Sequence, residues 1–167
     1  MSKLICFCGP DRVGKSTAAA AASAAAAAGS VIHFTGPRPE HSTPYQQYEG
    51  LLNPQSSVTV ADRVWLEASF YDQHRRGIVY DDIWLTHFER RLKKTYASVV
   101  INLITSEWDS VMVSRHLSEL QEQAPQASKW WLDNQLSVRK REHEAYYRFI
   151  EEIEVKSLFS LQYLYRQ

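Results

Sequence analysis

The sequence predicts an α/β fold in which a parallel sheet of about five strands lies between two layers of helices. Two observations lead to this prediction. Short apolar segments typical of buried strands alternate with longer segments typical of helices, and a glycine-containing loop joins the first strand to the first helix. Because right-handed crossovers between parallel strands place helices on both faces of the sheet, the expected architecture is a three-layer αβα sandwich.

The amino-terminal part supplies the first two strands. Residues 3–8 are mostly apolar and predict a strand. Residues 16–28 are rich in alanine, the best helix former, and Gly29 is a helix stop. The β-branched residues within 31–34 predict a second strand, and the Gly- and Pro-rich residues 35–39 predict a loop at its carboxyl end. Open α/β folds bind their ligands at such loops.

The middle of the chain predicts a short helix at 45–52, which an Asn-Pro pair ends. A third strand is expected at 57–61, and the unbroken segment 64–76 predicts a helix. Residues 83–95 form an amphipathic pattern with apolar side chains on one face and basic side chains on the other. We interpret that basic face as solvated.

The carboxy-terminal part begins with residues 98–103, a continuous apolar run of the kind that parallel sheets bury on both sides. Helices are expected at 108–123 and 129–152, on either side of Pro125. Residues 158–163 are compatible with a last strand or with the end of a helix.

Length and composition set broad limits on the protein. A chain of 167 residues with 44% hydrophobic content fills one core, so we expect a single domain over residues 1–167. The 19 basic and 19 acidic residues balance, which argues against a protein that binds nucleic acid through bulk charge but allows a local basic groove. We expect no membrane partner and a cytoplasmic location, with Cys6 and Cys8 as buried reduced thiols.

Residues 9–16 match the phosphate-binding motif G-x-x-x-x-G-K-S. Its glycines let backbone N–H groups surround an anion, while Lys15 reaches the β- and γ-phosphates and the Ser16 hydroxyl binds Mg²⁺. A glycine turn that matches by chance is the alternative, and the flanking strand and helix argue against it. The residues expected to bind ATP in this segment are Gly9, Asp11, Val13, Gly14, Lys15, Ser16 and Thr17.

The rest of the chain narrows the class of phosphate chemistry. GTPases need a base-reading Asn/Thr-Lys-x-Asp segment, which the sequence lacks, and the chain is too short for the second subdomain of motor ATPases. A small kinase needs cations around two phosphate groups and a carboxylate near the acceptor, and the sequence can supply both. The other class of function that stays open is a non-catalytic nucleotide-binding module.

Residues 7–17, F-C-G-P-D-R-V-G-K-S-T, carry an aspartate and an arginine inside the loop. In this they resemble thymidylate kinase and its relatives among small deoxynucleotide and phage-type P-loop kinases. The resemblance implies a P-loop kinase fold with ATP and Mg²⁺ as cofactors, Arg12 on the transferring γ-phosphate, and Asp11 on the sugar hydroxyl of the acceptor. Some family members instead use arginines of a lid over ATP, but the lid expected at about 115–130 has no arginine after Arg115.

A second segment, Asp62 to Asp72, is similar to the family's D-R-Y-x-x-S-x-x-A-Y-Q. The resemblance implies that Arg63 holds the acceptor phosphate and that Asp62 lies near Mg²⁺ and the reacting oxygen. It also implies that Phe70 and Tyr71 face the acceptor. Glu67 replaces the family's serine, which gives a second candidate, besides Asp62, for the base that would receive a proton from a hydroxyl acceptor.

Two further arginines are candidates. Arg38 lies in F-T-G-P-R, which resembles the family's F-P-x-R element, and would be a second clamp on an acceptor phosphate unless it is an exposed loop arginine. Arg115 lies where the family often has an arginine near adenine or the phosphates. We interpret 139–141 as part of a solvated helix face, whereas 74–77 could face solvent or a polynucleotide backbone.

The sequence therefore predicts an ATP- and Mg²⁺-dependent kinase of a deoxynucleotide, in the first place a thymidylate-type monophosphate, with the acceptor region at about 35–80. A hydroxyl acceptor is the alternative, either a deoxynucleoside or 5-hydroxymethyluracil in DNA. Arg38 favours the phosphate and Glu67 favours the hydroxyl. A homodimer is compatible with the sequence.

Overall fold

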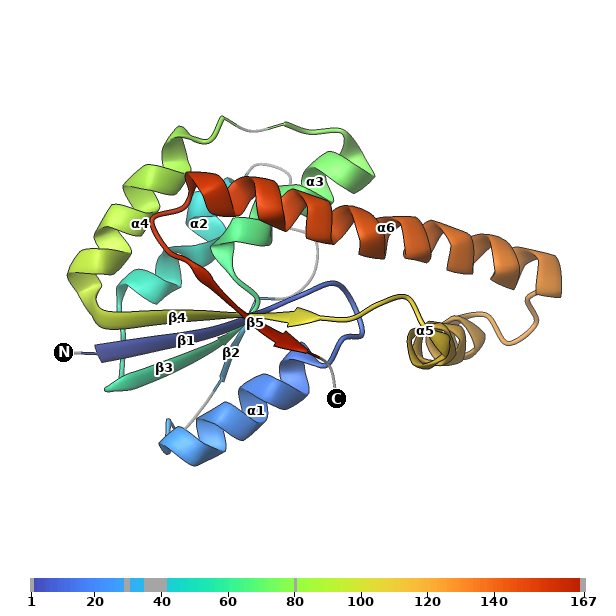
Figure 1. Ribbon diagram of the computed structural model, residues 1–167, viewed down its shortest axis with the longest axis horizontal. Helices are drawn as coiled ribbons and strands as arrows, with labels where there is room; N and C mark the ends of the chain where they lie inside the picture. The colour runs from blue at the N-terminus through green and yellow to red at the C-terminus, as the bar shows by residue number, and fades with distance from the viewer. Residues whose placement is uncertain (1, 29–30, 35–41, 80, 166–167) are drawn as a thin grey trace.

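The strands of the computed structural model, which describes residues 2–28, 31–34, 42–79 and 81–165, form one parallel sheet in the order β2-β3-β1-β4-β5 (Figure 1). The pairing of Phe7 with Asp62 in one direction and with Asn102 in the other brings the carboxyl ends of the three central strands to one edge. The strands are β1 (Ser2–Cys8), β2 (Val31–His33), β3 (Val58–Asp62), β4 (Tyr96–Thr105) and β5 (Leu161–Tyr165).

Helices cover both faces of this sheet, which confirms the predicted three-layer α/β architecture. In Figure 1, α1 covers one face, α2, α3, α4 and α6 cover the other, and α5 lies beyond the carboxyl ends of the strands. The α-helices are α1 (Lys15–Ala26), α2 (Pro44–Tyr48), α3 (Ala68–Arg76), α4 (Ile83–Thr95), α5 (Ser110–Gln123) and α6 (Lys129–Lys156). Two 3₁₀ helices, η1 (Glu49–Leu52) and η2 (Trp65–Glu67), precede β3 and α3.

The alternation of side chains along β1 divides the core between the two faces. Leu4, Cys6 and Cys8 are fully buried in the larger cluster, under α4 and α6, whereas Phe7 points into the smaller cluster with Ala19 of α1. Both cysteines are free and buried, as expected for thiols that share one face of a strand. The alanine-rich α1 presents only small side chains to the sheet.

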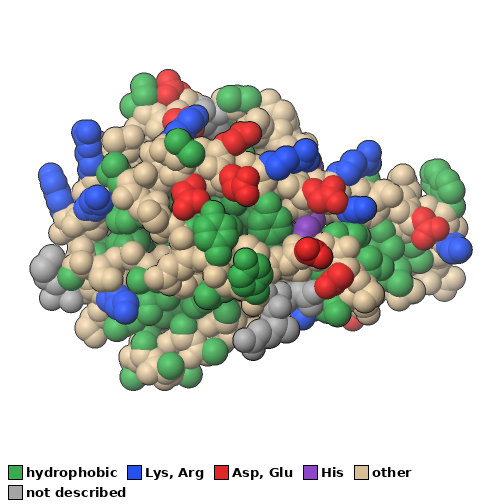
Figure 2. All heavy atoms as spheres, viewed as in Figure 1, with side chains coloured by type: hydrophobic (Ala, Val, Ile, Leu, Met, Phe, Trp, Pro, Cys, Tyr) green, Lys and Arg blue, Asp and Glu red, His purple; other side chains and the backbone are tan. Residues whose placement is uncertain are grey.

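Two predicted elements are corrected or resolved. The segment expected as one helix from 64 starts with the 3₁₀ turn η2, and regular α-helix begins only at Ala68. Residues 161–165 pair with β4 as a parallel edge strand, which settles the open alternative at the carboxyl end. Among the helices of the described residues, none combines the length and the apolar character needed to cross a bilayer. Figure 2 shows acidic and basic side chains interleaved along α6, a mixed face rather than a basic groove.

Candidate functional site

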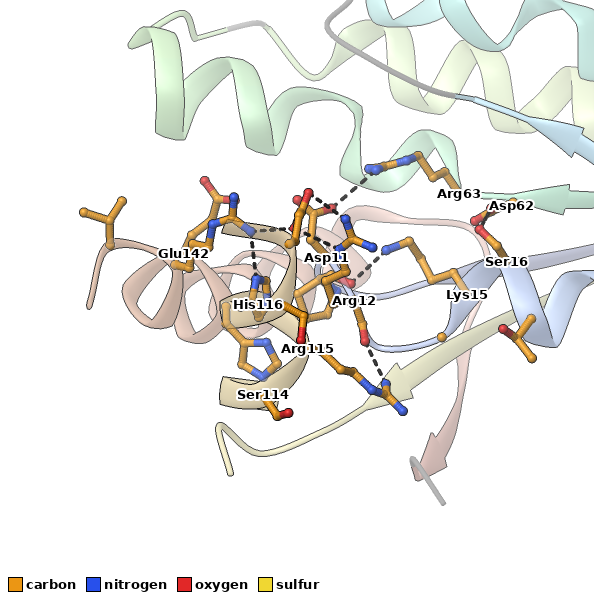
Figure 3. A pocket seen from close by; sticks show the side chains of 18 of the residues that line it. Asp11, Arg12, Lys15, Ser16, Asp62, Arg63, Ser114, Arg115, His116 and Glu142 are labelled. Atoms are coloured by element: carbon orange, nitrogen blue, oxygen red, sulfur yellow. Dashed lines mark hydrogen bonds and ion pairs between the residues drawn. The ribbon is translucent and has the colours of Figure 1, made fainter. Parts of the chain in front are cut away.

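A cavity of about 1,040 Å³ lies at the carboxyl edge of the sheet, between the loop that follows β1 and the helices α5 and α6 (Figure 3). The carboxyl ends of the strands share this edge because the sheet is parallel, and open α/β folds place ligands there. The predicted residues that line the cavity are Asp11, Arg12, Gly14, Lys15, Ser16, Thr17, Asp62, Arg63 and Arg115.

The shape of the loop depends on its glycines. Gly9 and Gly14 have φ angles of 151° and 103°, which side-chain-bearing residues rarely adopt. A Cβ at Gly9 would lie 2.8 Å from Cγ2 of Val13, whose side chain is buried against the α1 face of the core. Val13 can therefore contribute only backbone groups to the cavity. Its buried side chain anchors the loop to the core.

Lys15 begins α1 with its ammonium group turned back into the loop. Its Nζ donates to the carbonyls of Gly9 (2.9 Å) and Pro10 (2.8 Å), and its side chain is buried. Burial lowers the pKa of Lys15, although the nearby carboxylate of Glu67 opposes this effect. The N–H of Gly9 donates to the hydroxyl of Tyr146 on α6, at 3.0 Å. Side chains thus bind both the N–H and the carbonyl of Gly9.

Arg12 occupies a left-handed backbone conformation, with φ 67°, and its carbonyl accepts a hydrogen bond from Arg115 Nη1 at 2.8 Å. Its guanidinium group makes a forked contact with Glu119 of α5, through Nε to Oε2 (2.9 Å) and Nη2 to Oε1 (2.6 Å). Arg139 of α6 donates to the same Oε2 at 2.6 Å. Hydrogen bonds from Arg12, and then from Arg139, lower the pKa of Glu119 to about 2.

Ser16 and Asp62 form the part of the site that could hold a metal ion. Ser16 Oγ donates to Asp62 Oδ2 at 2.6 Å, and His33 Nδ1 lies 3.0 Å from the same oxygen. Asp62 Oδ1 is buried and accepts no hydrogen bond from the described residues. A hydroxyl and a carboxylate oxygen that still needs a partner fit a hard cation such as Mg²⁺, which prefers few protein oxygens and keeps several waters.

A second, smaller cavity of about 140 Å³ adjoins the first, and Asp11 lines both. The carboxylate of Asp11 accepts hydrogen bonds from Arg63 Nη2 (3.4 Å), Tyr71 (3.4 Å) and Arg75 Nη2 (3.3 Å). Burial alone would raise the pKa of Asp11, but the charges of Lys15, Arg63 and Arg75 together lower it. The other lining residues are Phe34, Gln47, Tyr48, Glu67, Ala68, Asp72 and Arg76.

Arg63 directly follows β3, and its N–H donates to the carbonyl of Phe7 at 2.8 Å, as in the sheet. The chain then turns sharply, with φ 87° at Arg63, and the guanidinium group lies 5.5 Å from the ring centre of Tyr71. Arg75 stacks on that ring more closely, at 4.6 Å. The two arginines and Asp11 therefore meet around Tyr71, at the junction of the two cavities.

Glu67 lies at the buried side of the smaller cavity, with 1% of its surface exposed. Its Oε2 accepts a hydrogen bond from the Tyr146 hydroxyl, and its Oε1 lies 3.9 Å from Arg63 Nη1. That oxygen accepts no hydrogen bond from the described residues. Burial raises the pKa of Glu67 despite the opposing charge of Arg63. Through Tyr146, the carboxyl group is connected to Gly9 of the phosphate loop.

One predicted substrate contact, Phe70, is not found in the site. Phe70 is 3% exposed and lines neither cavity, because it lies on the face of α3 that packs against Tyr146 and Phe149 of α6. The next residue, Tyr71, is rotated toward the cavity by the helical repeat. Arg38 lies outside the described residues.

Sequence reasoning missed the cationic and acidic residues that α3, α5 and α6 bring to the larger cavity. Arg75 lines the cavity and makes a forked contact with Glu142, through Nε to Oε2 (2.9 Å) and Nη2 to Oε1 (2.5 Å). Its side chain is 53% exposed, so solvent and a polynucleotide backbone both stay open as what 74–77 would face. The interpretation of 139–141 as a solvated face is wrong for Arg139, whose side chain is 24% exposed and lines the cavity. The rotation of α3 and α6 about their axes decides that Arg75 and Arg139 line the cavity, and local charge patterns do not reveal that rotation.

His116 of α5 was also not selected from the sequence. It is 3% exposed, packs on Trp108 with ring centres 4.9 Å apart, and its Nδ1 lies 3.1 Å from Arg139 Nη1. Since a guanidinium group can only donate, Nδ1 is the acceptor and the hydrogen is on Nε2. Burial, and then the charge of Arg139, lowers the pKa of His116 to about 4.

Comparison with known proteins identifies the fold. No family model matches the sequence, and no curated protein matches it with significance. Among solved structures, the chain is similar to the YorR protein of Bacillus subtilis, which was crystallised in complex with phosphorylated GDP. The similarity has a TM-score of 0.61 with 17% sequence identity and covers 97% of this chain and 84% of that one. The likeness extends over nearly the whole chain and supports the three-layer α/β fold.

Proposed function

We propose that this chain is a P-loop phosphotransferase that transfers the γ-phosphoryl group of ATP, with Mg²⁺, to a deoxynucleotide. The observation that carries the proposal is the junction of the two cavities at Asp11. A loop built to surround phosphates adjoins a smaller pocket there, and Arg63 and Arg75 line both cavities. A protein that only binds a nucleotide does not need arginines that reach from the phosphate loop into a second pocket. The nucleotide bound to the YorR protein supports a nucleotide as the ligand.

In the larger cavity, the donor phosphates would take over the contacts that the loop now makes with itself. Lys15 would exchange the carbonyls of Gly9 and Pro10 for β- and γ-oxygens, and backbone N–H groups of the loop would complete the cradle. Ser16 and Asp62 would hold Mg²⁺, which neutralises phosphate charge when it is bound.

In the smaller cavity, the arginines favour a monophosphate acceptor, in the first place of the thymidylate type. An oxygen of that phosphate forms a bond to the γ-phosphorus, the bond between the γ-phosphorus and the β,γ-bridging oxygen breaks, and ADP leaves with the electron pair. A phosphate oxygen is already deprotonated, so the step needs no base. Arg63 and Arg75 would orient the acceptor, and Arg12 would stabilise the charge that develops on the transferring group.

One observation favours a second candidate, a kinase of a hydroxyl acceptor such as a deoxynucleoside or 5-hydroxymethyluracil in DNA. Glu67 Oε1 is a buried carboxyl oxygen at the smaller cavity that accepts no hydrogen bond from the described residues. A hydroxyl could donate to it and pass its proton to Glu67 as the oxygen attacks, provided that Glu67 is ionised. Asp62 is the other candidate base.

A transfer screen with labelled ATP tests the proposal. The acceptors are the four deoxynucleoside monophosphates, the corresponding nucleosides, and DNA with or without 5-hydroxymethyluracil. We expect transfer to a monophosphate, and a loss of turnover of at least about a hundredfold in Lys15→Ala and in Arg12→Ala. Lys140→Ala, which removes a half-exposed cation from α6, is the control and should retain activity. ATP binding without transfer to any acceptor would instead indicate a binding module.

A further inference from the structure

Glu119 brings a negative charge to a cavity whose loop is built to bind anions. Its carboxylate receives a fork from Arg12 and a further hydrogen bond from Arg139, at distances of 2.6 to 2.9 Å. Two guanidinium groups that converge on one planar oxyanion are the arrangement that arginines also use for phosphate. The three side chains come from three separate places in the fold: the phosphate loop, α5 and α6 (Figure 3 labels Arg12 among the residues that line the cavity).

This arrangement conflicts with the role proposed for Arg12. A guanidinium group that is committed to Glu119 cannot use the same two N–H groups on a phosphoryl oxygen, because the forked contact occupies both Nε and Nη2. The Nε–Nη2 edge of Arg12 can therefore bind the transferring group only after it leaves Glu119. The inference that follows rests on the proposed function.

We propose that Glu119 stands in for the γ-phosphate in the nucleotide-free protein, and that the γ-phosphate of the incoming donor displaces it from Arg12. Glu119 is then a specificity-determining residue that lowers the preference of the site for a nucleoside triphosphate over a diphosphate. A diphosphate does not extend to Arg12 and leaves the pair with Glu119 intact. After transfer, the return of Arg12 to Glu119 competes with the departing product and helps to release it.

The exposure of the pair makes the exchange feasible. The side chains of Arg12 and Glu119 are 47% and 22% exposed, so water reaches the pair and screens part of its attraction. A terminal phosphate carries close to two negative charges, whereas the carboxylate carries one, and it offers three oxygens to the guanidinium groups. The phosphate can therefore displace the carboxylate, while water alone does not.

Isothermal titration with Mg²⁺ and either ADP or a non-hydrolysable ATP analogue tests the inference. Glu119→Gln keeps the shape of the side chain and removes its charge, so we expect the analogue to bind about three- to tenfold more tightly, with a change of less than about twofold for ADP. Glu122→Gln is the matched control, because it removes an exposed charge of the same helix that attracts Arg12 from a distance, so its effect on the affinity for the analogue should be smaller than that of Glu119→Gln. In an Arg12→Ala background, Glu119→Gln should no longer change the ratio of the two affinities.

Several outcomes would overturn the inference. An equal change in both affinities for Glu119→Gln, no change at all, or the same change in Glu122→Gln would show that Glu119 does not compete with the γ-phosphate. Circular dichroism checks that each variant is folded, and Glu119→Asp, which shortens the carboxylate by one methylene, should change the ratio in the same direction by a smaller factor. If the unmodified protein binds neither nucleotide, the proposed function itself fails, and the two failures are thereby distinguished.

Discussion

Tyr146→Phe removes a single oxygen atom that connects the phosphate loop to Glu67. This hydroxyl is fully buried, accepts a hydrogen bond from the Gly9 N–H and donates one to Glu67. The phenylalanine ring would keep the aromatic contacts with Phe70 and Tyr147, so the change isolates the two hydrogen bonds. Each buried group left without a partner costs ~1–3 kcal/mol, so the free energy of unfolding should fall by about 2–6 kcal/mol.

Tyr147→Phe is the matched control for this variant. The neighbouring hydroxyl also makes two hydrogen bonds, to the Ile104 carbonyl (2.8 Å) and from the Ser106 N–H (2.9 Å), but its surroundings are only partly buried. Water can replace those bonds, so we expect a loss of only about 1 kcal/mol. Neither of these two hydrogen bonds involves the phosphate loop, so nucleotide affinity should stay the same.

Urea denaturation followed by tryptophan fluorescence measures both losses, and ADP titration measures the effect on the loop. Tyr146→Phe should weaken ADP binding severalfold, because the Gly9 N–H loses the side chain that fixes it before the nucleotide binds. The reasoning is refuted if Tyr146→Phe destabilises the protein no more than Tyr147→Phe does. It is also refuted if ADP affinity responds equally to the two changes.

Three further predictions concern groups around the same cavity. Because the pKa of Glu119 is lowered to about 2 in the folded protein from 4.5, its ion pairs contribute stability above about pH 4.5, and this contribution disappears as the pH falls toward 2. The difference in unfolding free energy between the natural protein and Glu119→Gln, measured by denaturant titration, should shrink over that range; a constant difference would contradict it. The pKa of His116 is lowered to about 4 from 6.5, so as the pH falls its imidazole is protonated in the unfolded chain before it is protonated in the folded protein. The free energy of unfolding should therefore decrease as the pH drops from 6.5 to 4. NMR titration of the imidazole checks the value, and a normal midpoint would disprove the burial argument. Gly9→Ala places a Cβ 2.8 Å from Val13 at a φ of 151°, and should destabilise the fold by about 2–5 kcal/mol in thermal melts, whereas an unchanged melting temperature would contradict this steric argument.

The fold could be predicted from the sequence because each strand carries a local signal. The apolar run at 98–103 and the alanine-rich segment at 16–28 identify a buried strand and a close-packed helix without knowledge of the rest of the chain. Residues 161–165 could not be assigned, because an edge strand with four exposed residues lacks the apolar continuity of a central one. Its identity depends on pairing with β4, which local sequence does not encode.

The candidate site was only partly predictable, for a related reason. Lys15, Ser16 and Asp62 follow directly from a motif and from the end of a strand, and their positions in space are fixed by chain connectivity. Arg75 and Arg139 depend on the rotation of α3 and α6 relative to the sheet, and the acidic residues beside them make each segment resemble a solvated helix face. The packing of one helix against another decided which charges point inward.

The left-handed backbone at Arg12 and Arg63 affects which amino-acid substitutions can stabilise this protein. Each of these conformations costs about 1–2 kcal/mol for a residue with a side chain and almost nothing for glycine. A search for stability alone would therefore replace both arginines with glycine and remove the two guanidinium groups on which the proposed chemistry depends. With the proposed function, arginine at both positions trades stability for activity, so stabilising substitutions should be sought elsewhere in the chain.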